Sequence, residues 1–145
     1  MTTSLADMLK SWKLKPLPET LIDHVAALVQ DETHYVRIEV DTSSQPVSYS
    51  VTVITAKALF IIEGASIGEF DERLSGTSIR VIPLRRVQEL IVDADCWGFP
   101  TRTDDPGRLV LDTDEQVLLG EHRSSQQHAE VVLGGTLASV AALLH

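Results

Sequence analysis

The sequence predicts a mainly β domain with helices at both ends. Apolar residues at helical spacing mark residues 5–12 and 21–29 near the start and residues 137–144 at the end. Between them, apolar and polar residues alternate with a period of two, as in strands with one buried face. The 145 residues, 43% of them apolar and 23% charged, are the size and composition of one globular domain. We therefore expect one domain spanning all 145 residues, with a helical extension over 1–31 and a β-rich core over 34–145.

The first helix has an apolar stripe formed by Leu5, Met8, Leu9 and Trp12. A connector containing two prolines, residues 13–18, separates it from a second helix that should end near Gln30. A helix of about three turns is marginal by itself, so the stripe must pack either on its own domain or on a second chain. We favour a homo-oligomer, because the connector allows the first helix to reach a neighbouring subunit.

The strands are expected in a meander of antiparallel pairs. They cover His34–Asp41, Val47–Thr55, Leu59–Ile62 and Ser78–Ile82, followed by a hairpin of residues 109–111 and 117–119. On the first of these strands Tyr35, Arg37 and Glu39 should form the wet face. Residues 65–76 read as a loop, and residues 83–93 suit either a helix or a bent strand.

Two segments carry a resemblance to a known family. The first runs from Thr55 to Gly64 (TAKALFIIEG) and the second from Ile82 to Val92 (IPLRRVQELIV). Together with the closing hairpin and helix, they resemble the bacterial pleckstrin-homology-like domains over roughly Val47 to His145. The resemblance implies a bent antiparallel sheet, or partly open barrel, closed by a C-terminal helix, and it favours a strand at residues 83–93.

The chain departs from that family's pattern in two places, its N-terminal helices and the insertion at residues 65–77. The rival interpretation makes residues 84–95 a helix. The order of elements would then be similar to that of small acidic secretion-chaperone-like proteins, and the chain would form a homodimer.

The charge disfavours two classes of partner. Twelve Lys and Arg against 21 Asp and Glu give a net charge of −9, which opposes nucleic acids and stable binding to anionic membranes. The N-terminus lacks the apolar core of a secretion signal, no apolar run is long enough to span a bilayer, and the single Cys96 can form no internal disulfide. We expect a cytoplasmic protein.

The residues that could bind metal or catalyse a reaction form no recognisable pattern. His122 and His128 flank a polar stretch without further ligands at fixed spacing, and the acidic clusters at residues 93–95, 104–105 and 112–115 suit turns better than ion binding. Cys96 has acidic neighbours, which oppose a thiolate, and no motif frames a nucleophilic serine. We expect no cofactor, no metal and no enzymatic activity.

Exposed aromatic, apolar and basic residues are the remaining candidates for a partner-binding site. They are Leu9, Trp12, Arg85, Arg86, Trp97 and Phe99. Arg85 and Arg86 could meet an acidic group, although pairing of the basic residues with the surplus carboxylates is the competing expectation. The sequence thus favours a non-catalytic binding or scaffolding module acting through protein contacts. The alternatives are a small-ligand carrier or enzyme with a pocket under the bent sheet, and the chaperone-like homodimer.

Overall fold

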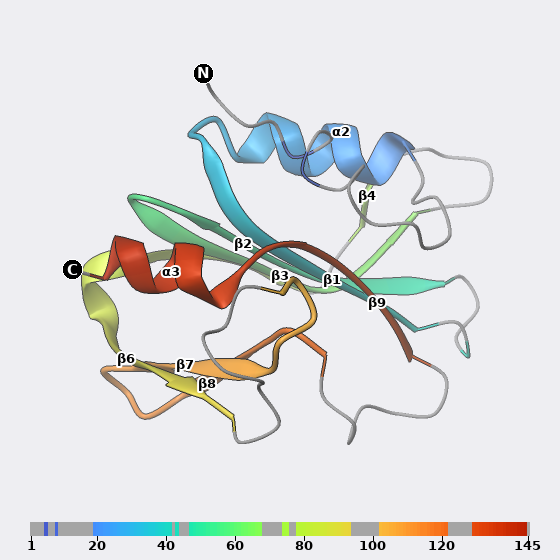
Figure 1. Ribbon diagram of the computed structural model, residues 1–145. Helices are drawn as coiled ribbons and strands as arrows, with labels where there is room; N and C mark the ends of the chain where they lie inside the picture. The colour runs from blue at the N-terminus through green and yellow to red at the C-terminus, as the bar shows by residue number, and fades with distance from the viewer. Residues whose placement is uncertain are drawn as a thin grey trace.

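The computed structural model is a layered β structure with a helix on one side (Figure 1). It describes Leu5, Met8 and residues 19–41, 43, 47–67, 74–75, 78–93, 102–121 and 129–144. A large antiparallel sheet forms the middle layer. Helix α2 (Glu19–Leu28) covers one face of this sheet, and a smaller antiparallel sheet lies against the other face. The fold class is therefore mainly β, as the sequence predicted.

The large sheet has the strand order β4-β3-β2-β1-β9, with β5 also paired to β3, and the small sheet has the order β6-β7-β8. The strands of the large sheet are β1 (Thr33–Asp41), β2 (Ser48–Thr55), β3 (Ala58–Ile67), β4 (Leu74–Ser75), β5 (Ser78–Pro83) and β9 (Ala129–Gly135). Those of the small sheet are β6 (Val87–Val92), β7 (Gly107–Leu111) and β8 (Gln116–Leu119). Helix α3 (Leu137–Leu143) follows β9.

Most of the expected elements are confirmed, including the strand that the family resemblance favoured at residues 83–93. After Pro83 the chain makes one 3-10 turn, Leu84–Arg86, and continues as strand β6 rather than as a helix. Pro83 has no N–H for the ladder and marks the point where the chain leaves the large sheet. The order of elements therefore does not match the rival pattern with a helix at residues 84–95.

One expectation about β structure is wrong, and one strand was not predicted. Residues 65–76 are not simply a loop, because β3 runs on to Ile67 and pairs with the short strand β4. Strand β9 was not expected, yet it pairs with β1 along seven positions, from Ala129 to Gly135. Gly134 and Gly135 form the end of this strand. Helix α3 begins at Leu137 after its N-cap Thr136, whose side-chain oxygen accepts a hydrogen bond from the N–H of Ser139.

The face of the large sheet under α2 holds one apolar core. Leu21 and Val25 of the helix pack there on β-branched residues of the strands, such as Val36 and Ile38. Leu5, which is 4% exposed, belongs to the same core. Met8 packs against it. The described half of the predicted N-terminal stripe thus packs on its own domain, whereas Leu9 and Trp12 lie outside the described residues.

A second core lies between the two sheets. Tyr35, Ile54 and Leu59 of the large sheet meet Leu109 and other apolar residues of the small one. Helix α3 contributes to the same core with Leu137 and Val140. The predicted wet face of β1 is therefore wrong at this end of the strand, because the small sheet covers Tyr35 and Arg37 and both are buried.

Candidate functional site

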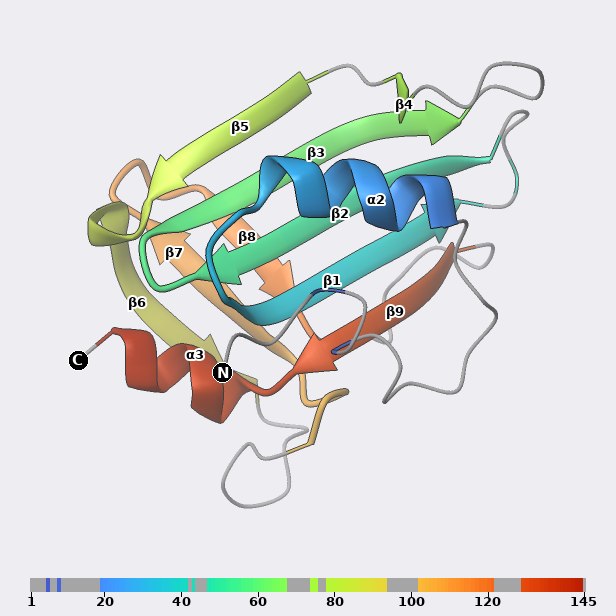
Figure 2. The ribbon, with the colours of Figure 1, turned by 90° about the horizontal axis from the view of Figure 1, so that it is seen from above.

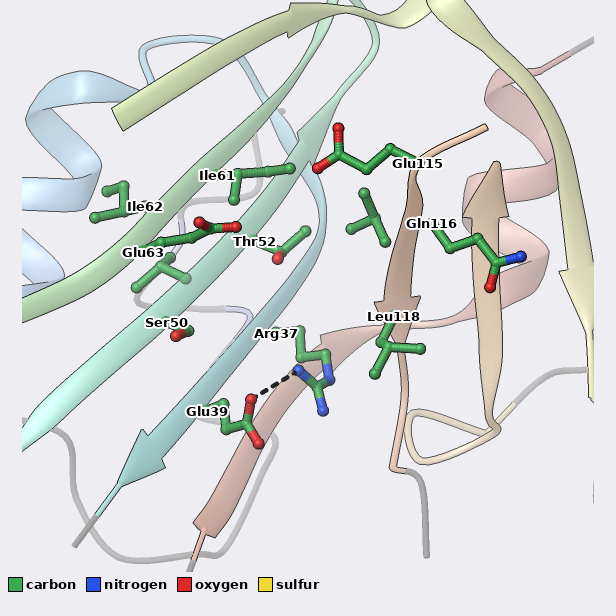
Figure 3. Close-up of a pocket in the computed structure, with 12 residues that line it drawn as sticks. Arg37, Glu39, Ser50, Thr52, Ile61, Ile62, Glu63, Glu115, Gln116 and Leu118 are labelled. Atoms are coloured by element: carbon green, nitrogen blue, oxygen red, sulfur yellow. Dashed lines mark ion pairs between the residues drawn. The ribbon is translucent and has the colours of Figure 1, made fainter. Parts of the chain in front are cut away.

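A groove of about 370 Å³ lies where the small sheet stops covering the large one (Figure 3). Its floor is formed by residues of β1, β2 and β3, and one wall by residues 115–118 on and beside β8. Polar groups converge on it from both sides. They are Arg37, Glu39, Ser50, Thr52, Glu63 and Glu115.

Strand β8 crosses the large sheet at a steep angle. The strand register places Arg37, Thr52, Ile61 and Arg80 side by side in one row across β1, β2, β3 and β5. Gly120, at one end of β8, accepts a hydrogen bond from Arg37 Nε to its carbonyl oxygen (2.9 Å). Glu115, at the other end, accepts two from Arg80 (2.5 and 2.7 Å). From Arg37 on β1 to Arg80 on β5 there are three strand spacings, about 14 Å, and from Glu115 to Gly120 there are five residues of extended chain, about 16 Å. Because these two lengths are similar, β8 lies along the row, nearly perpendicular to the four strands.

The row next to β8 forms the open floor of the groove. It consists of Glu39, Ser50 and Glu63, which come from three neighbouring strands. The register shifts here, so that both Glu63 and Gly64 oppose Ser50, and Gly64 has the positive φ (73°) that such a bulge requires. The floor is therefore polar and carries two carboxylates.

The edge of β8 that faces the groove has backbone groups directed away from β7. The N–H of Leu111 donates to the carbonyl of Glu115 (2.9 Å), which makes these two residues a hydrogen-bonded pair. Because such pairs alternate along an antiparallel ladder, Val117 is also bonded to β7, whereas the N–H and C=O of Gln116 and Leu118 point outwards. Among the described strands, only β7 pairs with β8.

At Gly120 the same edge is already bonded to the large sheet. The N–H of Gly120 donates to the hydroxyl oxygen of Tyr35 (2.5 Å), while its carbonyl oxygen accepts from Arg37. The side chains of β1 thus supply here the contacts that a neighbouring strand would supply. The edge next to it, at Leu118 and Gln116, faces the groove.

Arg37 is the most deeply buried charged side chain of the groove. Its side chain is 7% exposed, and Nη1 lies 3.6 Å from a carboxylate oxygen of Glu39. Burial of a charge is costly unless it is paired and hydrogen-bonded, and the Glu39 carboxylate and the Gly120 carbonyl meet this need. The sequence indicated only an Arg and a Glu two residues apart on a strand. The only sequence signal at Arg37 is its position between the apolar residues Val36 and Ile38 on a strand. Its burial depends on the small sheet that covers this part of β1.

Burial raises the pKa of Tyr35 from 10.0 to about 12. Because the folded-state pKa lies above the unfolded value, the stability linked to this hydroxyl is complete below about pH 10 and is lost as the pH rises through 12. We expect alkaline unfolding in this range, with a loss of about 3 kcal/mol from this group. Absorbance of tyrosinate during a pH titration tests this. Tyr35→Phe should leave one transition, that of Tyr49, whose pKa burial also raises above 10.0. In Tyr49→Phe the remaining tyrosine, Tyr35, should ionise only as the chain unfolds.

The two described residues that the sequence offered as a partner site, Arg85 and Arg86, do not line the groove. Arg86 donates to the Asp112 carboxylate (3.1 to 3.2 Å) and Arg85 is exposed. Pairing of basic residues with surplus carboxylates is confirmed at several positions. The pairs are Lys57–Asp31, Arg80–Glu115, Arg86–Asp112 and Arg108–Asp93. Leu9, Trp12, Trp97, Phe99, Cys96, His122 and His128 lie outside the described residues.

Two acidic residues of the loops, Asp105 and Asp114, have the turn chemistry that the sequence suggested. The Asp105 carboxylate accepts a hydrogen bond from the N–H of Arg102 (2.9 Å), and Asp114 has the positive φ (67°) of a hairpin turn. Within the described part of the chain, no three His, Cys, Asp or Glu side chains are grouped so that they could hold a metal ion. None of the described helices is both long and apolar enough to span a bilayer.

Two carboxylates of the groove are paired with arginines, Glu39 with Arg37 and Glu115 with Arg80. The hydroxyl groups of Ser50 and Thr52 also line the groove. Its distinctive features are a strand edge, an acidic floor and two hydroxyl groups. Comparisons of the chain with models of protein families, with curated proteins and with solved structures found no match.

Proposed function

We propose that the chain is a non-catalytic binding module that receives an extended segment of a partner protein in the groove beside β8. The observation that carries the proposal is the edge of β8, where the backbone groups of Gln116 and Leu118 point into the groove. An extended segment that adds a strand to an exposed sheet edge gains main-chain hydrogen bonds, and neighbouring pockets then select its side chains. Two residues on the edge offer four such bonds.

The charges around the groove favour a basic segment. A strand added beside β8 would lie over the row that contains Glu39 and Glu63, so alternate side chains would point at these two carboxylates. The net charge of −9 would also steer a basic partner towards the chain. Leu118 is 43% exposed and offers an apolar contact. The preferred ligand is therefore an extended segment in which basic and apolar residues alternate.

A small-ligand carrier is the second candidate. The volume of the groove lies within the range of small-molecule sites, and Ser50 and Thr52 could orient a polar ligand. Arg37 is the group that would attract an anion, but Glu39 already pairs with it, which favours the peptide. The chaperone-like homodimer loses its support because residues 87–92 form a strand.

We also propose that the fold is a variant of the pleckstrin-homology-like domain. Supporting this are the meander of β1, β2, β3 and β5, the crossing three-stranded sheet and the C-terminal helix α3. The variant would differ by β9, which is inserted between the last strand of the small sheet and the helix, and by α2 on the far face of the large sheet.

Titration with short synthetic peptides tests the function. We expect a peptide of alternating Lys and Val to bind, with chemical-shift changes in amides of β8, and a matched Glu and Val peptide not to bind. Glu63→Gln should weaken binding by up to about fivefold, because Glu63 is exposed and an exposed ion pair contributes about 0–1 kcal/mol. Leu118→Pro should abolish it, since this N–H points to the groove and not to β7.

Glu89→Gln is the matched control, because it removes an exposed carboxylate on β6 outside the groove. Equal binding of both peptides, or no binding of either, would overturn the proposal. Binding of small carboxylates in the groove with loss in Arg37→Met would favour the small-ligand carrier instead.

A further inference from the structure

Strand β5 forms an edge of the large sheet and exposes two large apolar side chains. Among the described strands it pairs only with β3, and it lies at the outer side of the sheet (Figure 2). Ile79 is 58% exposed and Val81 is 56% exposed. They lie beside Ile62 and Phe60, on the same face as α2, but the helix does not cover them. Exposed apolar edge strands are sites where another strand can pair.

The backbone of β5 is directed so that the same two residues present their hydrogen-bonding groups to solvent. The N–H of Leu84 donates to the carbonyl of Lys57 (3.0 Å), so Ala58 and Pro83 between them form a pair without ladder bonds. Because bonded and non-bonded pairs alternate along the strand, Ser78, Arg80 and Ile82 make the hydrogen bonds to β3. The N–H and C=O groups of Ile79 and Val81 therefore point away from β3.

We propose that two copies of the chain pair through β5, antiparallel and around a two-fold axis at Arg80. In this register Ile79 lies opposite Val81 of the partner subunit, and Val81 opposite the partner's Ile79. Both pairs are of the hydrogen-bonded kind, so the outward groups of all four residues are satisfied by four bonds. The four apolar side chains then form one cluster on the α2 face, continuous with Phe60 and Ile62.

Two alternative registers among the described residues of β5 are worse. A shift by two places Ile79 opposite Pro83, which has no N–H, and leaves a carbonyl of Ile79 without a donor. A shift by one places Ile79 opposite the partner's Arg80, whose N–H and C=O groups point towards its own β3 and cannot bond to Ile79. The proposed register brings Arg80 opposite the partner's Arg80, but each guanidinium is already paired with both oxygens of its own Glu115. A second copy therefore fits this edge by symmetry.

The contact is small, so the dimer should be weak. Stable complexes bury about 800 Å² per partner, more than one short strand edge provides. We expect sedimentation equilibrium of the full chain to show a mass that rises with concentration from one chain towards two. The double variant Ile79→Lys with Val81→Lys should remain at the mass of one chain at every concentration, because it places charges on the edge.

Leu28→Lys and Val92→Lys are the controls, since both replace exposed apolar residues elsewhere and should leave the association unchanged. Circular dichroism checks that each variant folds. A monomer at all concentrations would overturn the inference, and so would a dimer that survives the double variant, which would place the interface elsewhere, as at the N-terminal helix. Peptide binding in the groove is measured separately, so the two proposals can fail independently.

Discussion

Gly120→Ala is expected to lower the free energy of unfolding by about 3–5 kcal/mol, the range of severe core lesions. Gly120 has φ of 73°, which is unfavourable for alanine, and an added Cβ would fall on the backbone of Asp105. It would lie 2.7 Å from the carbonyl carbon of that residue and 3.0 Å from Pro106 Cα. This backbone cannot easily move, because Asp105 is buried and the adjacent Asp104 carbonyl accepts from the N–H of Glu121 (3.2 Å).

Urea unfolding followed by circular dichroism measures this loss. Gly107→Ala is the matched control, because φ at Gly107 is not in the positive region and its closest contact, at 2.8 Å, is the flexible end of the Leu137 side chain. We expect a smaller loss there. If the two variants were equally stable, the close approach at Gly120 would not be a constraint on the fold.

Arg37→Met is expected to cost about 2–4 kcal/mol, although methionine keeps much of the apolar stem. The change leaves the Gly120 carbonyl without its donor and the Glu39 carboxylate without its ion pair. Since Glu39 is partly exposed, water can solvate it, and most of the loss comes from the missing hydrogen bond and the disturbed end of β8.

The matched control is Arg86→Met, which removes an arginine whose carboxylate partner, Asp112, lies at the surface. Exposed pairs of this kind contribute about 0–1 kcal/mol. Denaturant midpoints of the two variants therefore separate a buried link between the sheets from a surface ion pair. Equal losses in both would show that Arg37 does not connect them.

Local patterns predicted the strands but not how the two sheets meet. The period of two identified β1 and β2, and the family resemblance favoured the strand that became β6. The extent of β3 was missed because the continuous apolar run of Leu59–Ile62 ends at Glu63 and Gly64, which form a bulge inside the strand instead of ending it. Strand β9 was missed because its continuous apolar run ends in two glycines next to a helix, where they resemble a helix start.

The groove could not be predicted for a different reason. Arg37 and Glu39 were correctly placed on one face of β1, but only the tertiary crossing of β8 decides that Arg37 is buried and Glu39 is partly exposed. The edge groups of Gln116 follow from the hairpin register, which the sequence left open. The sequence candidates for a partner site rested instead on residue type, and the two described ones, Arg85 and Arg86, do not line the groove.

The pairing of β1 with β9 has a consequence for how the chain folds. Tyr35 is the partner of Gly135, 100 residues further along, so the loop that must close is about two thirds of the 145 residues. Contacts this distant in sequence are made late and slowly, after local hairpins such as that of β2 and β3. During synthesis β1 therefore keeps an open edge until residues 129–135 have been made, and a folding intermediate that exposes this edge is the species most at risk of aggregation.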